Sequence, residues 1–333
     1  MDVSSKLRII EAHRPHWSSA WAWVAFLAGF GIAEALLLWS LLRGPVWLVV
    51  PLTFLTAHLM HAHLIALHEA AHRSLCPSRW WNDAFGMFIG TLGFMPFSLY
   101  RVAHHSHHAF LATERDEELW PFVSPGTPRW ARRLAALLEL TLGVLYTPWL
   151  FLRAFLRDGS MIRNRMIRRR IWGEYVLMVC VWCALFTAAG WSGTGRYLFP
   201  VFFAPALLAG NMQSLRKYIE HMGLTGSTVL GSTRSVVSRG PIGRLVAFSL
   251  FDITYHGVHH RFAGMPHAKM PEFTSVLTPT NAEEPAPYPS YRSALRDMLQ
   301  SLGDPRVGAQ WDGSPSGAVK KLYPLETRRP LAA

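Results

Sequence analysis

Four long apolar segments constrain the fold of this 333-residue chain more than any other feature. They cover residues 21–42, 45–67, 174–191 and 197–215. A helix needs about 20 mainly apolar residues to cross the hydrocarbon core of a bilayer, and each segment is close to that length. Only Arg43 and Gly44 separate the first pair, and a short turn at 192–196 separates the second. The sequence therefore predicts two antiparallel membrane hairpins.

The composition agrees with a membrane protein. Hydrophobic residues make up 50% of the chain and charged residues only 16%, whereas a typical soluble domain carries about 25% charged residues. Three cysteines provide no framework for a disulfide scaffold. The first residues are polar, so we expect no cleavable signal peptide.

Basic residues predict the orientation of the hairpins. The net charge is +12, and arginines are concentrated at 157–170, between the two hairpins. Such a run beside membrane spans marks the cytoplasmic side. No nucleic-acid-binding motif accompanies it, so we expect no nucleic-acid partner. Two shorter apolar stretches, 84–100 and 134–156, then begin and end on the cytoplasmic side. We expect them to be re-entrant or interfacial, or together a third hairpin.

These expectations define an all-α, multi-pass membrane protein with four main spans and a histidine-rich cap on the cytoplasmic side. Residues 1–19 would form a cytoplasmic N-terminal segment, 20–275 the membrane domain with its cap, and 276–333 a cytoplasmic C-terminal extension.

Three histidine motifs lie at or beyond the cytoplasmic ends of the apolar segments: HEAAH (68–72), HHSHH (104–108) and HGVHH (256–260). Residues i, i+3 and i+4 share one face of a helix, so the imidazoles of each motif can bind metal together. A further histidine follows the second hairpin on the same side. The expected metal ligands are His68, His72, His104, His107, His108, His221, His256, His259 and His260.

Nine imidazoles exceed the needs of one zinc ion, which takes about four ligands. They suit two six-coordinate metals with positions left open, and imidazole accommodates iron, copper, zinc or nickel. The remaining histidines have other expected roles. His105 lies off the shared face of its motif, and His58, His61 and His63 are interpreted either as contacts between helices or as groups that support the metal ligands. We expect His13, His16 and His267 at the surface.

The three motifs, in this order, resemble the histidine boxes of membrane fatty acid desaturases, a family that includes related hydroxylases and carotenoid ketolases. The resemblance extends over about residues 45–302 and includes RKYIEHMGL at 216–224 and YHGVHHRFAGMPHAKMPEF at 255–273. The chain departs from the family pattern at 261–263, where Leu-Phe-Pro is common, and at Val258, where an acid often stands.

The resemblance implies a non-heme di-iron enzyme that uses O2 and electrons from a separate ferredoxin-type donor. Its expected reaction is the introduction of a double bond into a lipid acyl chain, with the nine histidines binding two iron ions. Hydroxylation or ketolation of a fatty acid, alkane or carotenoid is the alternative. The expected location is the membrane, as a multi-pass protein of a bacterial inner membrane with a cytoplasmic active site.

Two other classes of protein account for fewer of these features. HEAAH also fits an intramembrane zinc peptidase with Glu69 as its base. That interpretation leaves seven histidines unexplained and offers only Asp252 as a third ligand. A metal transporter would need polar residues through the spans, but the histidines lie on one side of the membrane.

Overall fold

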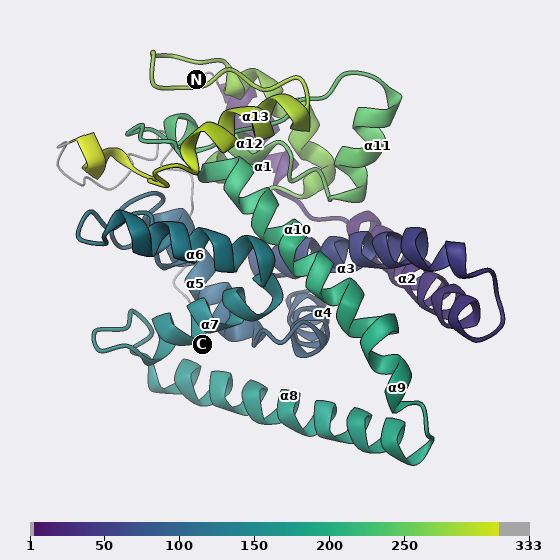
Figure 1. The fold of residues 1–333 in the computed structure, drawn as a ribbon. Helices are drawn as coiled ribbons and strands as arrows, with labels where there is room; N and C mark the ends of the chain where they lie inside the picture. The colour runs from purple at the N-terminus through teal and green to yellow at the C-terminus, as the bar shows by residue number, and fades with distance from the viewer. Residues whose placement is uncertain (1–2, 313–333) are drawn as a thin grey trace.

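The computed structural model describes residues 3–312, and these form helices without any β-strand. The first hairpin consists of α2 (Trp17–Leu42) and α3 (Val49–His72), and the second of α8 (Arg165–Trp191) and a helix that ends as α10 (Ala204–His221). Four helices in the described part are long and apolar enough to cross a membrane. The predicted fold class is confirmed. Both hairpin turns lie at the right of Figure 1, away from the cap.

Local sequence explains the two hairpins. A Cβ at Gly44 would lie 2.8 Å from the Trp39 ring, so the first turn needs a glycine to close this tightly. In the second hairpin, α9 (Gly195–Leu198) continues through a π-helical turn at Phe199–Phe203 before α10. Pro200 lies within this turn and Pro205 follows it, and proline removes the hydrogen-bond donor that a regular helix needs.

The two shorter apolar stretches are each broken into two helices. The first becomes α4 (Arg79–Leu92) and α5 (Phe97–Ala109), and the second α6 (Arg129–Thr141) and α7 (Gly143–Leu156). The longer helices of these pairs, α4 and α7, have 14 residues each, which gives a length of about 21 Å. That is shorter than the bilayer core of about 30 Å, so neither stretch crosses as one helix.

Close packing holds α7 against the span α10. A Cβ at Gly143 would lie 2.4 Å from the Gly210 carbonyl oxygen, and one at Gly210 would lie 2.3 Å from the Val144 nitrogen. Small residues allow membrane helices to approach this closely. The crossing fixes α7 beside α10, where α7 forms one wall of a cavity described below.

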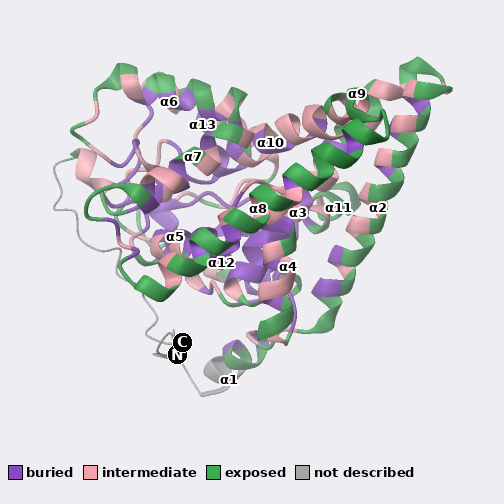
Figure 2. Ribbon diagram, turned by 90° about the horizontal axis from the view of Figure 1, so that it is seen from below, coloured by how far each residue is buried: buried purple, intermediate pink, exposed green. Residues whose placement is uncertain are grey.

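Buried residues concentrate where α3, α5 and α12 (His256–Arg261) meet, as the purple ribbon in Figure 2 shows. The outer faces of α2 and α8 are green, because their large apolar side chains are exposed. The side chain of Glu174 ties α8 to α5: its two oxygens accept hydrogen bonds from the Ser98 nitrogen at 2.8 Å and the Ser98 hydroxyl at 2.5 Å.

The remaining helices belong to the cap or lie at its edge. They are α1 (Val3–Ala12), α11 (Pro241–Ser249), α13 (Tyr291–Ser301), and the short segments Glu117–Leu119, Leu230–Ser232, His267–Leu277 and Ala309–Asp312. One further short segment, Val46–Leu48, lies in the turn of the first hairpin. Residues 302–312, the C-terminal clip, cross the cap after α13. Within the clip, Val307 N donates to the Phe122 carbonyl at 3.0 Å and Gly308 N to the Leu224 carbonyl at 2.9 Å.

Candidate metal centre

The structure brings all nine predicted histidines together, from the ends of α3 and α10 and from α5 and α12. They form two adjacent groups. The ligand nitrogens of the first group all lie within 4.8 Å of one another, and its members are His68, His72, His104, His108 and His259. The second group contains His107, His221, His256 and His260. The rings of His108 and His260, one from each group, stack at 4.3 Å.

The second and third boxes are each divided between the two groups, although their spacing predicted one shared face for each box. On α5, His104 and His108 are four residues apart and join the first group, while His107 points to the second. On α12, His259 joins the first group, and His256 and His260, again four apart, join the second. These two helices therefore each supply imidazoles to both groups.

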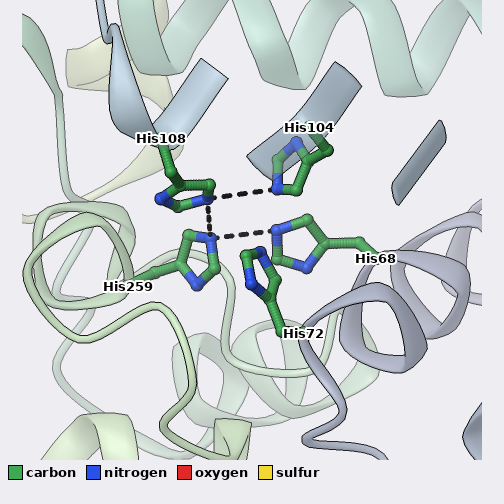
Figure 3. A group of neighbouring side chains, drawn as sticks. All are labelled: His68, His72, His104, His108 and His259. Carbon is green, nitrogen blue, oxygen red and sulfur yellow. Dashed lines mark hydrogen bonds between the residues drawn. The ribbon is translucent and has the colours of Figure 1, made fainter. Parts of the chain in front are cut away.

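The Nε2 atoms face one another at short distances. Within the first group His68 lies 3.0 Å from His259, His259 lies 2.9 Å from His108, and His108 lies 3.1 Å from His104. Figure 3 shows these four imidazoles joined by dashed lines, with His72 beside His68. In the second group His256 Nε2 lies 2.9 Å from His221 Nε2 and 3.0 Å from His260 Nε2.

These distances fit metal ligands. Two nitrogens bound at right angles to one metal, with bonds of about 2.1 Å, are about 3.0 Å apart. A tetrahedral arrangement with the same bonds would give about 3.4 Å. The buried Nε2 of His72 has no hydrogen-bond partner, although its ring centroid lies 4.7–4.9 Å from those of four other histidines of the first group. A metal ion at the centre of the group would satisfy this nitrogen.

Partners on the opposite ring nitrogens orient three of the imidazoles. Nδ1 of His107 lies 2.8 Å from Asp116 Oδ2, and Nδ1 of His104 lies 2.9 Å from Glu118 Oε2. Nδ1 of His221 lies 2.9 Å from the Ser232 carbonyl oxygen. A hydrogen-bond acceptor beside Nδ1 requires a proton on that nitrogen. The lone pair of the neutral ring then lies on Nε2, where it is free to bind a metal.

Burial keeps most of the cap imidazoles neutral, which is the form that binds metal. It lowers the pKa values of His108, His259 and His260 well below the usual range. Burial would also lower the pKa of His107, but Asp116 and Glu118 outweigh it and the net pKa is raised. In spite of its own burial, Glu118 has a pKa well below the usual range because His104 and His107 face it.

Several polar residues around the centre were not predicted. Asp116 and Glu118 follow the second box within a dense acidic segment at 114–118, a feature visible in the sequence. Glu220 precedes His221, and its Oε1 lies 3.5 Å from His256 Nδ1. The expected surface position of His267 is wrong. This residue is only 2% exposed, because its Nδ1 pairs with Asp252 Oδ2 at 2.9 Å.

Other histidines have partners outside the two groups. His105 Nε2 lies 3.0 Å from the Ala71 carbonyl oxygen, on α3, and His58 Nε2 lies 3.0 Å from the Ser249 hydroxyl, on α11. His63 Nδ1 lies 2.6 Å from the Leu59 carbonyl oxygen of its own helix. His58 thus forms the kind of contact between helices that we expected, whereas the hydrogen bond of His63 is local.

The arrangement differs from that of the zinc-peptidase alternative. Glu69 Oε2 accepts a hydrogen bond from the Ser74 hydroxyl at 2.8 Å. Its Oε1 lies 3.4 Å from Nδ1 of His68, the ring nitrogen opposite the metal-facing one. Asp252, the only candidate for a third ligand, is paired with His267 instead. Neither acid stands where a one-zinc peptidase site would need it.

An apolar cavity of about 130 Å³ lies beside the first group. Its walls come mainly from α3, α4, α7 and α10, and include Leu64, Ile89, Val144 and Ala206. Tyr100 also lines the cavity, and its ring stacks on His104 with a centroid distance of 5.3 Å and an angle of 5°. The cavity therefore reaches the wall of the candidate metal centre from inside the membrane region.

The helical membrane fold and the two imidazole groups define a membrane protein with a histidine-rich candidate metal centre. The sequence model of the fatty acid desaturase family matches residues 45–292. The chain belongs to this family, which confirms the resemblance of the three boxes.

Three curated relatives extend this comparison. The chain is 24% identical over 242 residues to a Delta(12) acyl-lipid conjugase (11E,13E-forming) of Impatiens balsamina, a match that covers 65% of this chain and 62% of that protein. It is 22% identical over 290 residues to a probable fatty acid desaturase of Sorghum bicolor, a match that covers 80% of this chain and 72% of that protein. It is 25% identical over 285 residues to an sn-1 acyl-lipid omega-3 desaturase (ferredoxin) of Synechocystis, a match that covers 78% of this chain and 74% of that protein.

Proposed function

We propose that this protein is a membrane desaturase that introduces a double bond into a lipid acyl chain, with two iron ions bound by the nine histidines and O2 as the oxidant. One observation carries the proposal: two adjacent groups of imidazoles have metal-like spacing, and an apolar cavity lies beside the first of them. The family and the three relatives, named as desaturases or a conjugase, support an acyl chain as substrate.

The overall reaction balances with one external reductant. Two hydrogens leave neighbouring carbons, which removes two electrons from the chain and forms the double bond. A donor supplies two more electrons, and with two protons from solvent the O2 molecule becomes two waters. The bound iron supplies the oxidising power needed to break an unactivated C–H bond, a chemistry that protein side chains alone do not provide.

The protein's own residues bind and position the substrate. The apolar walls of the cavity would hold an acyl chain in extended form and exclude water from it. Tyr100 packs between the cavity and His104, so it places the substrate chain at a fixed distance from the first group. Asp116 and Glu118 hold His107 and His104 in the orientation that aims Nε2 at the metal.

The electron donor and location are further parts of the proposal. A ferredoxin-type donor is supported by the printed name of the Synechocystis relative and by the net charge of +12, which attracts an acidic protein. A cytoplasmic active site in a bacterial inner membrane is supported by the arginines at 157–170. They lie in the segment after α7 and in the first turns of α8, on the cap side of the spans.

The test is expression in a bacterial host of known fatty acid composition, followed by mass spectrometry of the lipid acyl chains. The proposal predicts new double bonds at one position of the chain with the wild-type protein. His107→Ala should abolish them, and His16→Ala, at an exposed position, should not. New hydroxyl or keto groups without double bonds would contradict desaturation and support the alternative chemistry on the same metal centre.

A further inference from the structure

Four arginines from three helices and one helix end gather on the outer side of the first histidine box. Arg73 follows His72 directly, Arg79 begins α4, Arg101 lies on α5 and Arg170 lies near the start of α8. The other three arginines and Asp83 all lie close enough to Arg73 to act on it electrostatically. We call these four residues the arginine cluster.

The cluster carries more positive charge than its acidic neighbours offset. Asp83 accepts hydrogen bonds from Arg101 at 2.6 Å and pairs with Arg170 at 3.1 Å. Glu174 pairs with Arg170 at 3.1 Å. Four guanidiniums against two carboxylates leave a net charge of +2. Arg73 and Arg79 are both exposed, and neither forms an ion pair with any residue of 3–312.

Exposed tryptophans place the cluster at the level of lipid headgroups. Trp80 and Trp81 directly follow Arg79 and are 67% and 42% exposed, and Trp172 follows Arg170 by two residues and is 48% exposed. Tryptophan is enriched at the boundary between membrane and water. The helices α4 and α8, which carry these residues, pack side by side (Figure 2). Positive charge and aromatic rings thus occupy one strip of the protein surface.

From this arrangement we infer that the arginine cluster binds the phosphate headgroup of an anionic phospholipid in the leaflet on the cap side. Arg73 and Arg79 provide guanidinium groups that form no ion pair with a carboxylate of residues 3–312, and Trp80 and Trp81 pack against the glycerol and upper acyl region. An acidic soluble protein fits this strip less well, because the tryptophans would be left facing water. The inference goes beyond the proposed function and does not depend on desaturation.

Native mass spectrometry of the detergent-purified full chain tests the inference, with phosphatidylglycerol and phosphatidylcholine as competing probes. The wild type should retain phosphatidylglycerol in preference to phosphatidylcholine. The double variant R73Q/R79Q should lose about 25-fold in that preference, since each arginine near a membrane surface contributes about fivefold. The matched control is R292Q/R296Q, which removes two exposed arginines from α13 in the cap and should leave the preference unchanged.

A second readout separates a lipid site from a general anion site. Brominated phosphatidylglycerol should quench tryptophan fluorescence more strongly than brominated phosphatidylcholine, and W80F/W81F should remove that difference. Equal loss of preference in both arginine variants would overturn the inference. So would displacement of the lipid by inorganic phosphate or by an acidic peptide at the same concentration.

Discussion

The two histidine groups are built differently. The first has five imidazoles, but among its members only His104 has a carboxylate at hydrogen-bond distance from Nδ1. The second has four imidazoles, and two of them are oriented through Nδ1, His107 by Asp116 and His221 by the Ser232 carbonyl. Each group also has one carboxylate slightly farther from a ring nitrogen: Glu69 lies 3.4 Å from His68 Nδ1 in the first, and Glu220 lies 3.5 Å from His256 Nδ1 in the second. The first group relies on the number of ligands, whereas the second relies on partners that hold fewer ligands in place.

This difference predicts that the second group tolerates less change. His107→Ala removes one of four imidazoles and should lower the yield of desaturated acyl chains by more than about 100-fold, because a lost ligand costs more than a lost outer partner. His72→Ala leaves four imidazoles in the first group and should cost less. Acyl-chain analysis and iron content of both purified variants test the order. A larger loss in His72→Ala would reverse the comparison.

The next effect concerns the partner of His107. Asp116→Asn keeps the shape but removes the charge that holds the Nδ1 proton, and should weaken metal binding by about 10–100-fold. Titration with a chelator, followed by metal analysis, measures this. Glu114→Gln, at an exposed position in the same loop, is the control and should bind metal like the wild type. An Asp116→Asn variant with unchanged affinity would show that the carboxylate does not orient His107.

Glu118→Gln should have a smaller effect than Asp116→Asn. It removes the partner of His104, but the first group retains four other imidazoles. We expect metal affinity to fall about tenfold, the lower end of the range expected for Asp116→Asn. The same chelator titration applies. If Glu118→Gln weakened metal binding more than Asp116→Asn, the second group would not depend on its carboxylate partner more than the first group does.

The smallest effect is expected in the C-terminal clip, which supports both groups from a distance. Trp311 donates from Nε1 to the Phe122 carbonyl at 2.8 Å, and its ring packs under Arg132 and Arg306. Trp311→Ala should destabilise the protein by about 1–2 kcal/mol. Thermal unfolding in detergent measures this. Trp191→Ala, at a 91% exposed site in the far hairpin turn, should leave the melting temperature unchanged.

Much of the molecule follows from local sequence. Apolar length predicts the four long helices, and the i, i+4 spacing predicts that His68 and His72 share a face. The spacing also predicted one shared face for all three histidines of the second box and of the third, but His107 and His259 each join the other group. The division of α5 and α12 between two groups is not local, because it depends on how these helices cross. The same reason explains the error at His267. The sequence indicated a surface position for His267, but the fold places Asp252 against its ring.

The sequence also does not predict which acids support the histidines. The acidic segment at 114–118 contains four carboxylates, Glu114, Asp116, Glu117 and Glu118, and spacing alone does not separate their roles. In the structure Asp116 and Glu118 face histidines, Glu117 pairs with Arg153 at 3.1 Å, and Glu114 is exposed. These roles depend on the turn that follows α5 and on the position of α7.

The most direct test of the account is elemental analysis of the detergent-purified protein beside His107→Ala. The account predicts about two iron ions per chain in the wild type and a clear loss of iron in the variant, because each imidazole group would hold one six-coordinate metal. A single zinc ion per chain, retained when His107 is replaced, would contradict the two-metal centre and would return attention to HEAAH as a separate zinc site.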